Sequence, residues 1–191
     1  MIHFCLAAFL LLSVAVHGSD AEPVNRAEGR AYTLSAGAYF KAEGFGTEMD
    51  KDLVDPENPD AGRKMLLTGG APSAHHSPVI YSFWKAPEED SFINIGFDLE
   101  EPRTVTEVVV FGVNHTRMYG VRSIVIEASE DGLVYDGIAH LEPVEQPETG
   151  AWKASVPIKE KTRVRHLRVV VFARESAHLG LSAIEINGPG E

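Results

Sequence analysis

The sequence is poor in cysteine, and only Cys5 carries a thiol among its 191 residues. Cys5 lies in an apolar block at residues 4–16, which is too short to span a bilayer comfortably and has the length of a signal-peptide core. Small residues behind the block offer cleavage points before Ser19 and before Glu22. We therefore expect residues 1–21 to be a signal peptide and the protein to be secreted or periplasmic. An N-terminal anchor helix is the alternative.

Removal of this leader would leave a chain with no cysteine at all. Disulfides and thiol chemistry are then excluded, and the fold must be held together by core packing, with a bound metal as an additional source of stability left open.

Positive charge is also scarce. The chain has 17 Lys and Arg against 28 Asp and Glu, which gives a net charge of -11, and no run of basic residues interrupts this balance. Such a surface repels a phosphate backbone and an anionic membrane. We therefore expect neither nucleic acid nor anionic membrane among the partners.

Motifs for catalysis are missing as well. The sequence contains no serine nucleophile elbow, no HExxH and no glycine-rich phosphate loop. Acidic residues are plentiful, so a carboxylate pair of the glycosidase kind is not excluded by counting. We expect a protein that is not an enzyme.

Helical periodicity is absent from the centre of the chain, where strand patterns take its place. Residues 92–99 alternate apolar with polar, residues 105–113 are rich in β-branched side chains, and residues 124–129 lead into Asp131-Gly132. An Asp-Gly pair between apolar runs predicts a hairpin, with residues 133–135 beginning the return strand. Further short strands are expected at 31–35, 79–84, 137–141, 151–158, 164–173 and 179–186. This pattern predicts an all-β sandwich or jelly roll.

The order of these segments resembles the discoidin-like family, also called coagulation factor 5/8 type C or galactose-binding-like domains. The resemblance rests on "FDL" at 97–99, "VTEVVVFGVN" at 105–114, "IVIEASEDG" at 124–132, "VRHLRVVVFA" at 164–173 and "LSAIEI" at 181–186. It implies a jelly-roll sandwich of about eight antiparallel strands, which we place at residues 31–191. The polar composition of residues 22–30 predicts an irregular lead-in. It also implies carbohydrate binding.

Relatives of this kind often hold a structural calcium through an aspartate in "LTDG" and a glutamate before the last strand. Here "LTGG" places Gly69 at the first position, and Ala183 stands at the second. A shift of one residue would place Thr68 there, which is no carboxylate either. We therefore expect folding without calcium and without any other cofactor. The alternative is that carboxylates of the acidic loop at 50–60 replace the missing calcium ligands.

Two loops supply candidate ligand contacts, because loops at one end of a sandwich are held rigidly by the sheets. A sugar requires hydrogen-bonding groups for its hydroxyls and an aromatic face for its C–H surface. The candidates are Asn114, His115, Arg117 and Tyr119 in one loop and Arg174 and His178 in the other. The alternatives are a polar loop whose Asn caps a turn, and a solvated charged turn. Asn114-His115-Thr116 is also an N-glycosylation sequon, which has meaning only in a eukaryotic source.

The leading hypothesis is a secreted, non-catalytic carbohydrate-binding module that recognises a glycan or glycoconjugate. An extracellular protein-interaction or adhesion domain is the second hypothesis, and a jelly-roll carbohydrate-active enzyme is the third. A shallow site with aromatic residues would favour binding of a sugar, and an exposed apolar patch would favour a protein partner.

Overall fold

The computed structural model describes residues 22–36, 40–44, 67–68, 79–83, 92–114, 120–174 and 179–190. The expected leader at 1–21 and the acidic loop at 50–60 lie outside these residues. No helix within the described residues is long and apolar enough to span a membrane.

Nine strands make up the described part of the chain, and every pairing between them is antiparallel. They are β1 (Val24–Asn25), β2 (Thr33–Ala36), β3 (Phe40–Gly44), β4 (Val79–Phe83), β5 (Phe92–Asn114), β6 (Val121–Ser129), β7 (Asp136–Leu141), β8 (Gly150–Ala173) and β9 (Leu179–Gly188). Neighbours follow the order β3-β4-β9-β5-β8-β6-β7, with β1 paired to β9 and β2 to β5. The expectation of an all-β, antiparallel fold is confirmed.

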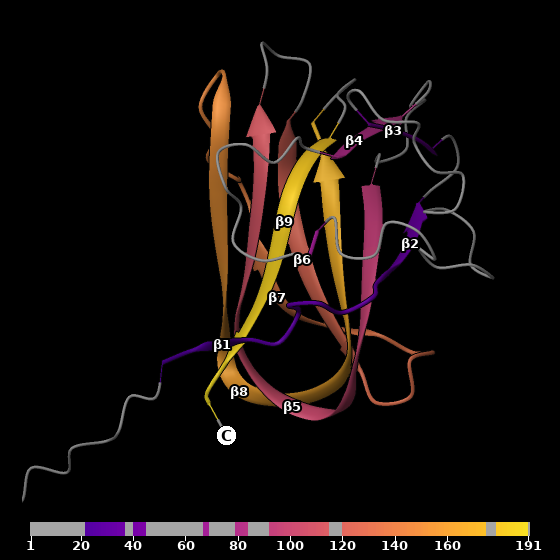
Figure 1. Cartoon of the computed structure of the whole chain (residues 1–191), viewed down its shortest axis with the longest axis vertical. Helices are drawn as coiled ribbons and strands as arrows, with labels where there is room; N and C mark the ends of the chain where they lie inside the picture. Colours follow the sequence, from indigo (N-terminus) through magenta and orange to yellow (C-terminus); the bar gives the residue numbers. More distant parts are fainter. Residues whose placement is uncertain are drawn as a thin grey trace, which may run out of the picture.

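The expectation of short strands only is wrong, because β5 and β8 have 23 and 24 residues. Each joins two runs that the sequence analysis separates at polar segments, near Pro102 and near residues 159–163. The two strands stay paired with each other on both sides of these segments and turn together, as the curve at the bottom of Figure 1 shows. Register shifts between Asp98 and Arg103 and between Val105 and Glu107 mark the turn, and Glu100 has a φ of 69° there.

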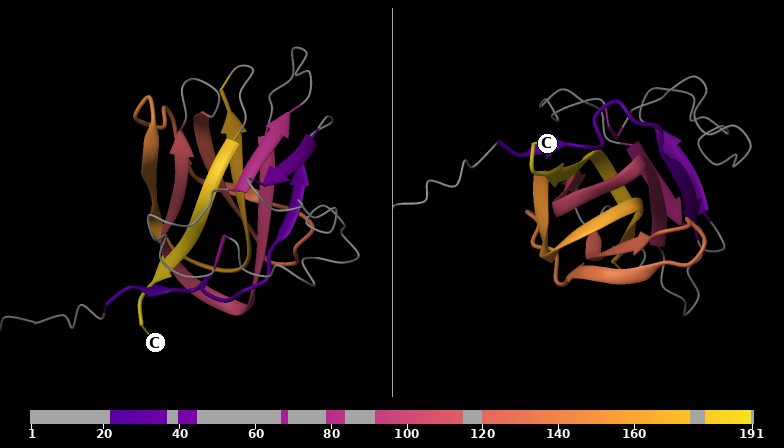
Figure 2. Two further views of the ribbon diagram at one scale, coloured as in Figure 1. Left: turned by 45° about the horizontal axis from the view of Figure 1, so that its top comes forward. Right: turned by 90° about the horizontal axis from the view of Figure 1, so that it is seen from below.

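This shared turn folds the sheet into two layers. One layer contains β2, the first part of β5, the last part of β8, β6 and β7, and the other contains β3, β4, β9, the second part of β5 and the first part of β8. The view from below in Figure 2 shows the strands around a common interior. We call the end of the sandwich where β5 and β8 turn the bend end, and the opposite end, where β5 stops at Asn114, the loop end.

The core lies between the layers and is built from alternate residues of the long strands. On β5 the fully buried side chains include Ile93 and Ile95, as the alternation at 92–99 predicts, and on β8 they include Leu167 and Val169. Gly112 is required near the loop end, because a Cβ there would lie 2.3 Å from the Gly180 carbonyl oxygen and 2.4 Å from the Trp152 ring. The fold therefore rests on apolar packing across the two layers.

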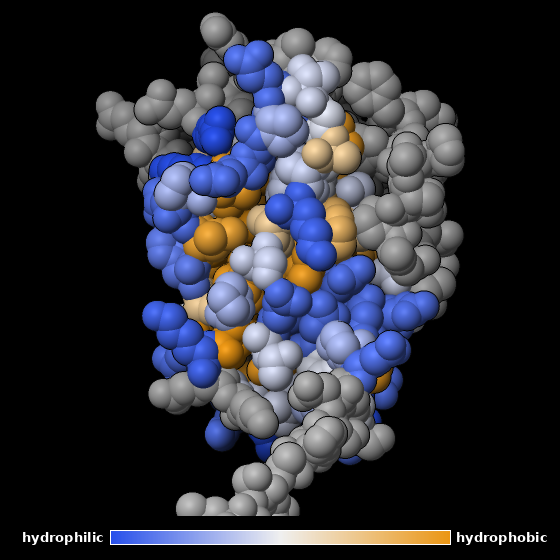
Figure 3. Space-filling view, turned by 90° about the vertical axis from the view of Figure 1, so that its left-hand side faces the viewer, coloured by the Kyte–Doolittle hydropathy of each residue, from blue (hydrophilic) through white to orange (hydrophobic). Residues whose placement is uncertain are grey.

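Along the side of the molecule where β8 runs, apolar side chains lie between hydrophilic ones (Figure 3). The Lys153 ammonium lies 5.5 Å from the centroid of the Phe111 ring. Ser155 donates a hydrogen bond to Glu107, which also accepts one from Asn187 at 3.2 Å. Glu107 thus joins Ser155 and Asn187 across three neighbouring strands, while Lys153 contacts an aromatic ring.

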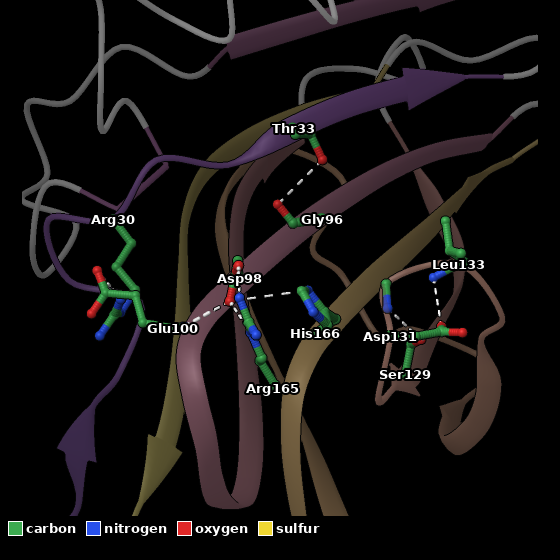
Figure 4. Close-up of polar contacts among 11 residues, drawn as sticks. Arg30, Thr33, Gly96, Asp98, Glu100, Ser129, Asp131, Leu133, Arg165 and His166 are labelled. Atoms are coloured by element: carbon green, nitrogen blue, oxygen red, sulfur yellow. Dashed lines mark hydrogen bonds and ion pairs between the residues drawn. The ribbon is translucent and has the colours of Figure 1, made fainter.

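Charged groups gather at the bend end (Figure 4). The Arg165 guanidinium binds both carboxylate oxygens of Asp98, each at 3.1 Å, and the Arg30 guanidinium lies 3.1 Å from Glu100. The hydrogen bond from Arg165 holds the pKa of Asp98 below its ordinary value. The backbone N–H of Glu100 donates to Asp98 at 2.7 Å, which fixes the start of the turn.

The expected lead-in at 22–30 takes part in the sandwich. Ala27 is fully buried in the core, and the Asn25 side chain accepts a hydrogen bond of 3.1 Å from the backbone of Ile186 on β9. Thr68 is also buried, and its hydroxyl donates to the Arg30 carbonyl at 2.8 Å. The first described segment is therefore held both by β9 and by Thr68.

Candidate functional site

The loop end brings together chain segments that are far apart in the sequence. β5 ends there at Asn114, β6 begins at Val121, and β8 both begins and ends there, since Gly150 pairs with Asn114 and Ala173 with Val121. The segment at 142–149 leaves β7 in one layer and enters β8 in the other. It therefore crosses the loop end between the two layers.

Asn114 lies at the end of β5 and is 6% exposed. Its side-chain amide Nδ2 donates a hydrogen bond of 2.6 Å to the Pro147 carbonyl, which ties β5 to the crossing segment. The side-chain oxygen Oδ1 is buried and has no hydrogen-bond partner within the described residues. A buried acceptor is costly without a donor, so among the described residues Oδ1 is a place where a hydrogen-bond donor would be favourable.

Gln146 ties the crossing segment to the other layer. Its amide nitrogen donates to the Val121 carbonyl at 2.6 Å, and its amide oxygen accepts the Val121 N–H at 3.1 Å. This pair of bonds reproduces the pairing that a strand residue would make with Val121. The Val144 N–H also donates to the Arg122 carbonyl at 3.1 Å.

Arg174 follows β8 and is exposed at the same end. Its backbone N–H donates to the Gly120 carbonyl at 2.9 Å, and its guanidinium Nη2 lies 3.4 Å from the Val144 carbonyl. The side chain passes over Gly120, where a Cβ would lie 3.0 Å from the Arg174 Cδ. Arg174 and Asn114 thus both contact the crossing segment, from the two layers.

The other sequence candidates, His115, Arg117, Tyr119 and His178, lie outside the described residues. His115 and Tyr119 belong to the segment between Asn114 and Gly120, and both ends of that segment are at the loop end. The sequon at Asn114 is also affected by the structure, because a buried amide nitrogen that donates to Pro147 is not accessible to glycosylation in the folded protein.

A second polar row lies at the bend end, and its hydrogen bonds differ from those of a catalytic triad. Asp98, His166 and Ser129 are cross-strand neighbours on β5, β8 and β6, and the His166 Nδ1 lies 4.0 Å from Asp98. The Ser129 hydroxyl donates to Asp131 at 3.0 Å and accepts the Gly132 N–H at 2.9 Å, and it makes no hydrogen bond with His166. The row therefore lacks an activated nucleophile. Among the described residues no three His, Cys, Asp or Glu side chains form a group that could hold a metal ion.

Sequence reasoning missed Gln146 and the other residues of the crossing segment, because residues 142–150 have the composition of an ordinary polar loop with two prolines. The one feature that could have indicated Gln146 is its amide side chain, since it lies in a segment that connects strands of the two layers.

This arrangement has the fold of the discoidin-like, or galactose-binding-like, domains, as the sequence motifs predict. One solved structure with this fold is the C-terminal domain of a chitobiase from Bacteroides fragilis, with a TM-score of 0.51 and 13% identity over 89% of this chain and 100% of that one. The lectin-binding domain of lectinolysin, solved with Lewis b, has a TM-score of 0.51 and 14% identity over 89% of this chain and 99% of that one.

A family 89 glycoside hydrolase from Clostridium perfringens is also similar, with a TM-score of 0.47 and 16% identity. The match covers 87% of this chain and only 15% of that enzyme. No protein-family model matches the sequence, and no curated protein is similar to it.

Proposed function

We propose that the protein is a non-catalytic carbohydrate-binding module whose ligand lies at the loop end. The observation that carries this proposal is the convergence of Asn114 and Arg174, from two layers, on one crossing segment. Both residues belong to the loops that the sequence analysis selects for sugar contacts. The lectinolysin domain solved with Lewis b supports the proposal as an example of this fold with a glycan.

The roles of the residues follow from their chemistry. Arg117 and Arg174 offer planar guanidinium groups that donate to neighbouring hydroxyls, and Tyr119 offers an aromatic face for the C–H surface of a sugar ring. His115 and His178 add further hydrogen-bonding groups. Asn114 is buried at the end of β5, and its Oδ1, which has no partner among the described residues, would accept a hydrogen bond from a ligand.

The test is a glycan-array screen of the chain without residues 1–21, with Lewis b included, followed by titration calorimetry of the glycan that binds best. Arg117→Ala, Tyr119→Ala and Arg174→Ala should each weaken binding. Loss of one charged hydrogen bond costs about 1.5–3 kcal/mol, which is roughly a ten- to hundredfold loss in affinity.

The control is Lys153→Ala, which removes an exposed cation from the outer face of β8 and should leave affinity unchanged. Thermal melts show whether each variant is folded. Unchanged affinity in all three folded loop-end variants would place the site elsewhere, and failure of the wild-type chain to bind any glycan would contradict carbohydrate binding itself.

We also propose that the protein is exported and loses residues 1–21. The apolar block at 4–16 and the small residues behind it support this proposal. Intact-mass measurement of the exported protein tests it, and a mass that retains Met1 would contradict it.

A further inference from the structure

The loop between β6 and β7 presents two adjacent aliphatic side chains to solvent at the bend end. Leu133 is 83% exposed and Val134 is 70% exposed. The sequence analysis expects these residues to begin a strand, but they precede β7, which starts at Asp136. Exposed turns usually carry polar residues or glycine, so an exposed Leu-Val pair is unusual there.

The turn that carries this pair is held in one conformation (Figure 4). One carboxylate oxygen of Asp131 accepts the N–H of Leu133 at 2.8 Å and that of Val134 at 3.1 Å. These two bonds, together with one from the Ser129 hydroxyl, lower the pKa of Asp131. Gly132 adopts a φ of +77°, as the Asp-Gly pair predicts. The backbone of the turn is thus ordered before a partner binds. Binding therefore costs less conformational entropy than it would at a disordered loop.

The surroundings of the pair are acidic. Between residues 127 and 142 the chain has five Asp and Glu and neither Lys nor Arg. The Arg168 guanidinium lies 4.1 Å from the centroid of the Tyr135 ring, but its charge is paired with Glu127. Glu130 and Asp136 are exposed on either side of Leu133 and Val134. A surface that binds this tip must therefore combine an apolar pocket with positive charge at its rim.

We propose that the Leu133–Val134 tip is a docking site for a partner protein that has an apolar pocket bordered by Lys and Arg side chains. A second copy of this chain is disfavoured, because two acidic tips repel each other and the whole chain carries a net charge of -11. An anionic membrane is disfavoured for the same reason. A charged rim around an apolar anchor is the usual composition of a protein interface.

The partner's path continues along β7. Within the described strands β7 pairs only with β6, so its outer edge follows directly from the tip. Asp136 and Gly137 are exposed at the start of this edge. The tip lies at the bend end, opposite the proposed glycan site, so both ligands could be bound at the same time. The inference does not depend on carbohydrate binding.

The test uses the full chain, produced in its own cells, with p-benzoylphenylalanine in place of Val134 as a photo-cross-linker. The matched control carries the same group in place of Lys153, which is exposed on β8 in the other layer. We expect a protein that is cross-linked from position 134 and not from position 153. That protein is then purified and titrated with the wild-type chain.

Leu133→Asp should weaken this binding at least tenfold, and Glu130→Lys should weaken it several-fold, with the larger effect at low salt. Both positions are exposed, so thermal melts should be unchanged. Equal capture from both positions, no capture from position 134, or unchanged affinity of Leu133→Asp would overturn the proposal. Cross-linked dimers of the chain would assign the tip to a second copy. Co-sedimentation of the chain with phosphatidylcholine–phosphatidylserine vesicles, lost in Leu133→Asp, would assign it to a membrane, and either result also overturns the proposal.

Discussion

The two ends of the sandwich are held together by different kinds of interaction. At the bend end, charged side chains hold the turns in place. Arg165 binds Asp98 through two hydrogen bonds, and Arg30 pairs with Glu100. Asp131 accepts the N–H groups of its own turn. At the loop end, the shortest contacts come from uncharged amides, since Asn114 donates to Pro147 and Gln146 pairs with Val121, and Arg174 adds one longer contact to Val144.

This difference has a physical reason. At the bend end the strands continue through the turn, so backbone pairing already connects the layers and exposed charges only fix the corner. At the loop end the strands stop, and a separate segment must connect the two layers. Amide side chains make these connections without the desolvation cost of a charge, since Gln146 bonds to Val121 through both its amide groups and Asn114 donates its Nδ2 to Pro147.

The largest effect is expected from Gly112→Ala near the loop end. The new methyl group would overlap the Gly180 carbonyl and the Trp152 ring, neither of which can move freely. We expect a loss of about 3 kcal/mol or more in the free energy of unfolding, measured by urea denaturation. Gly137→Ala on β7 is the control, because its Cβ would meet nothing within 4 Å. Equal stability of the two variants would show that β8 and β9 can move away from β5 at the loop end at little cost.

A smaller effect is expected from Gln146→Ala, which leaves the Val121 N–H and carbonyl without their partner. The free energy of unfolding should fall by about 1–2 kcal/mol. Glu148→Ala, an exposed change in the same segment, should lie within about 0.5 kcal/mol of the wild type. If both variants behave alike, the amide pairing does not hold the crossing segment in place.

Acid should weaken the bend end before the loop end. The pKa values of Asp98 and Asp131 are lowered in the folded state, so their contribution is fully present above the unfolded pKa of about 3.9 and is lost as the pH falls through the lower folded values. Amide-exchange protection factors of Glu100, Leu133 and Val134 should therefore fall as the pH is lowered from about 4 through the folded pKa values of the two carboxyl groups. The Val121 N–H, bound to an uncharged amide, should keep its protection. An equal loss of amide protection at both ends would show that charged groups do not stabilise the bend end more than the loop end.

Calcium should have the smallest effect. Gly69 and Ala183 offer no carboxylate for calcium. The hydroxyl of the buried Thr68 already donates a hydrogen bond to the Arg30 carbonyl. The melting temperature with millimolar calcium should differ from that with a chelator by no more than about 1 °C. A large calcium-dependent rise would instead indicate that the acidic loop at 50–60 supplies the ligands.

The sequence by itself determined the local features of the fold. Alternation at 92–99 identified the core face of β5, since neighbouring residues of a strand point to opposite sides. The Asp131-Gly132 pair located the β6–β7 hairpin, because few residues other than glycine tolerate a positive φ. Of the candidate site, the sequence predicted ligand contacts in loops at one end of a sandwich, and two of the residues it named, Asn114 and Arg174, lie at the same end.

Only the tertiary structure decided what depends on contacts between distant segments. The polar stretches near Pro102 and at 159–163 look like strand ends in the sequence. In the structure they are the corners of β5 and β8, because the two strands pair with each other on both sides of the turn. Gln146 became a substitute for a strand residue only when Val121 came within 2.6 Å of it. Leu133 reads as the start of a strand, and it is exposed because Asp131 captures its N–H before β7 begins. In the first two cases the contacting residues are far apart in the sequence. In the third, two acceptors compete for the same N–H group. A short sequence pattern does not determine which of these contacts forms.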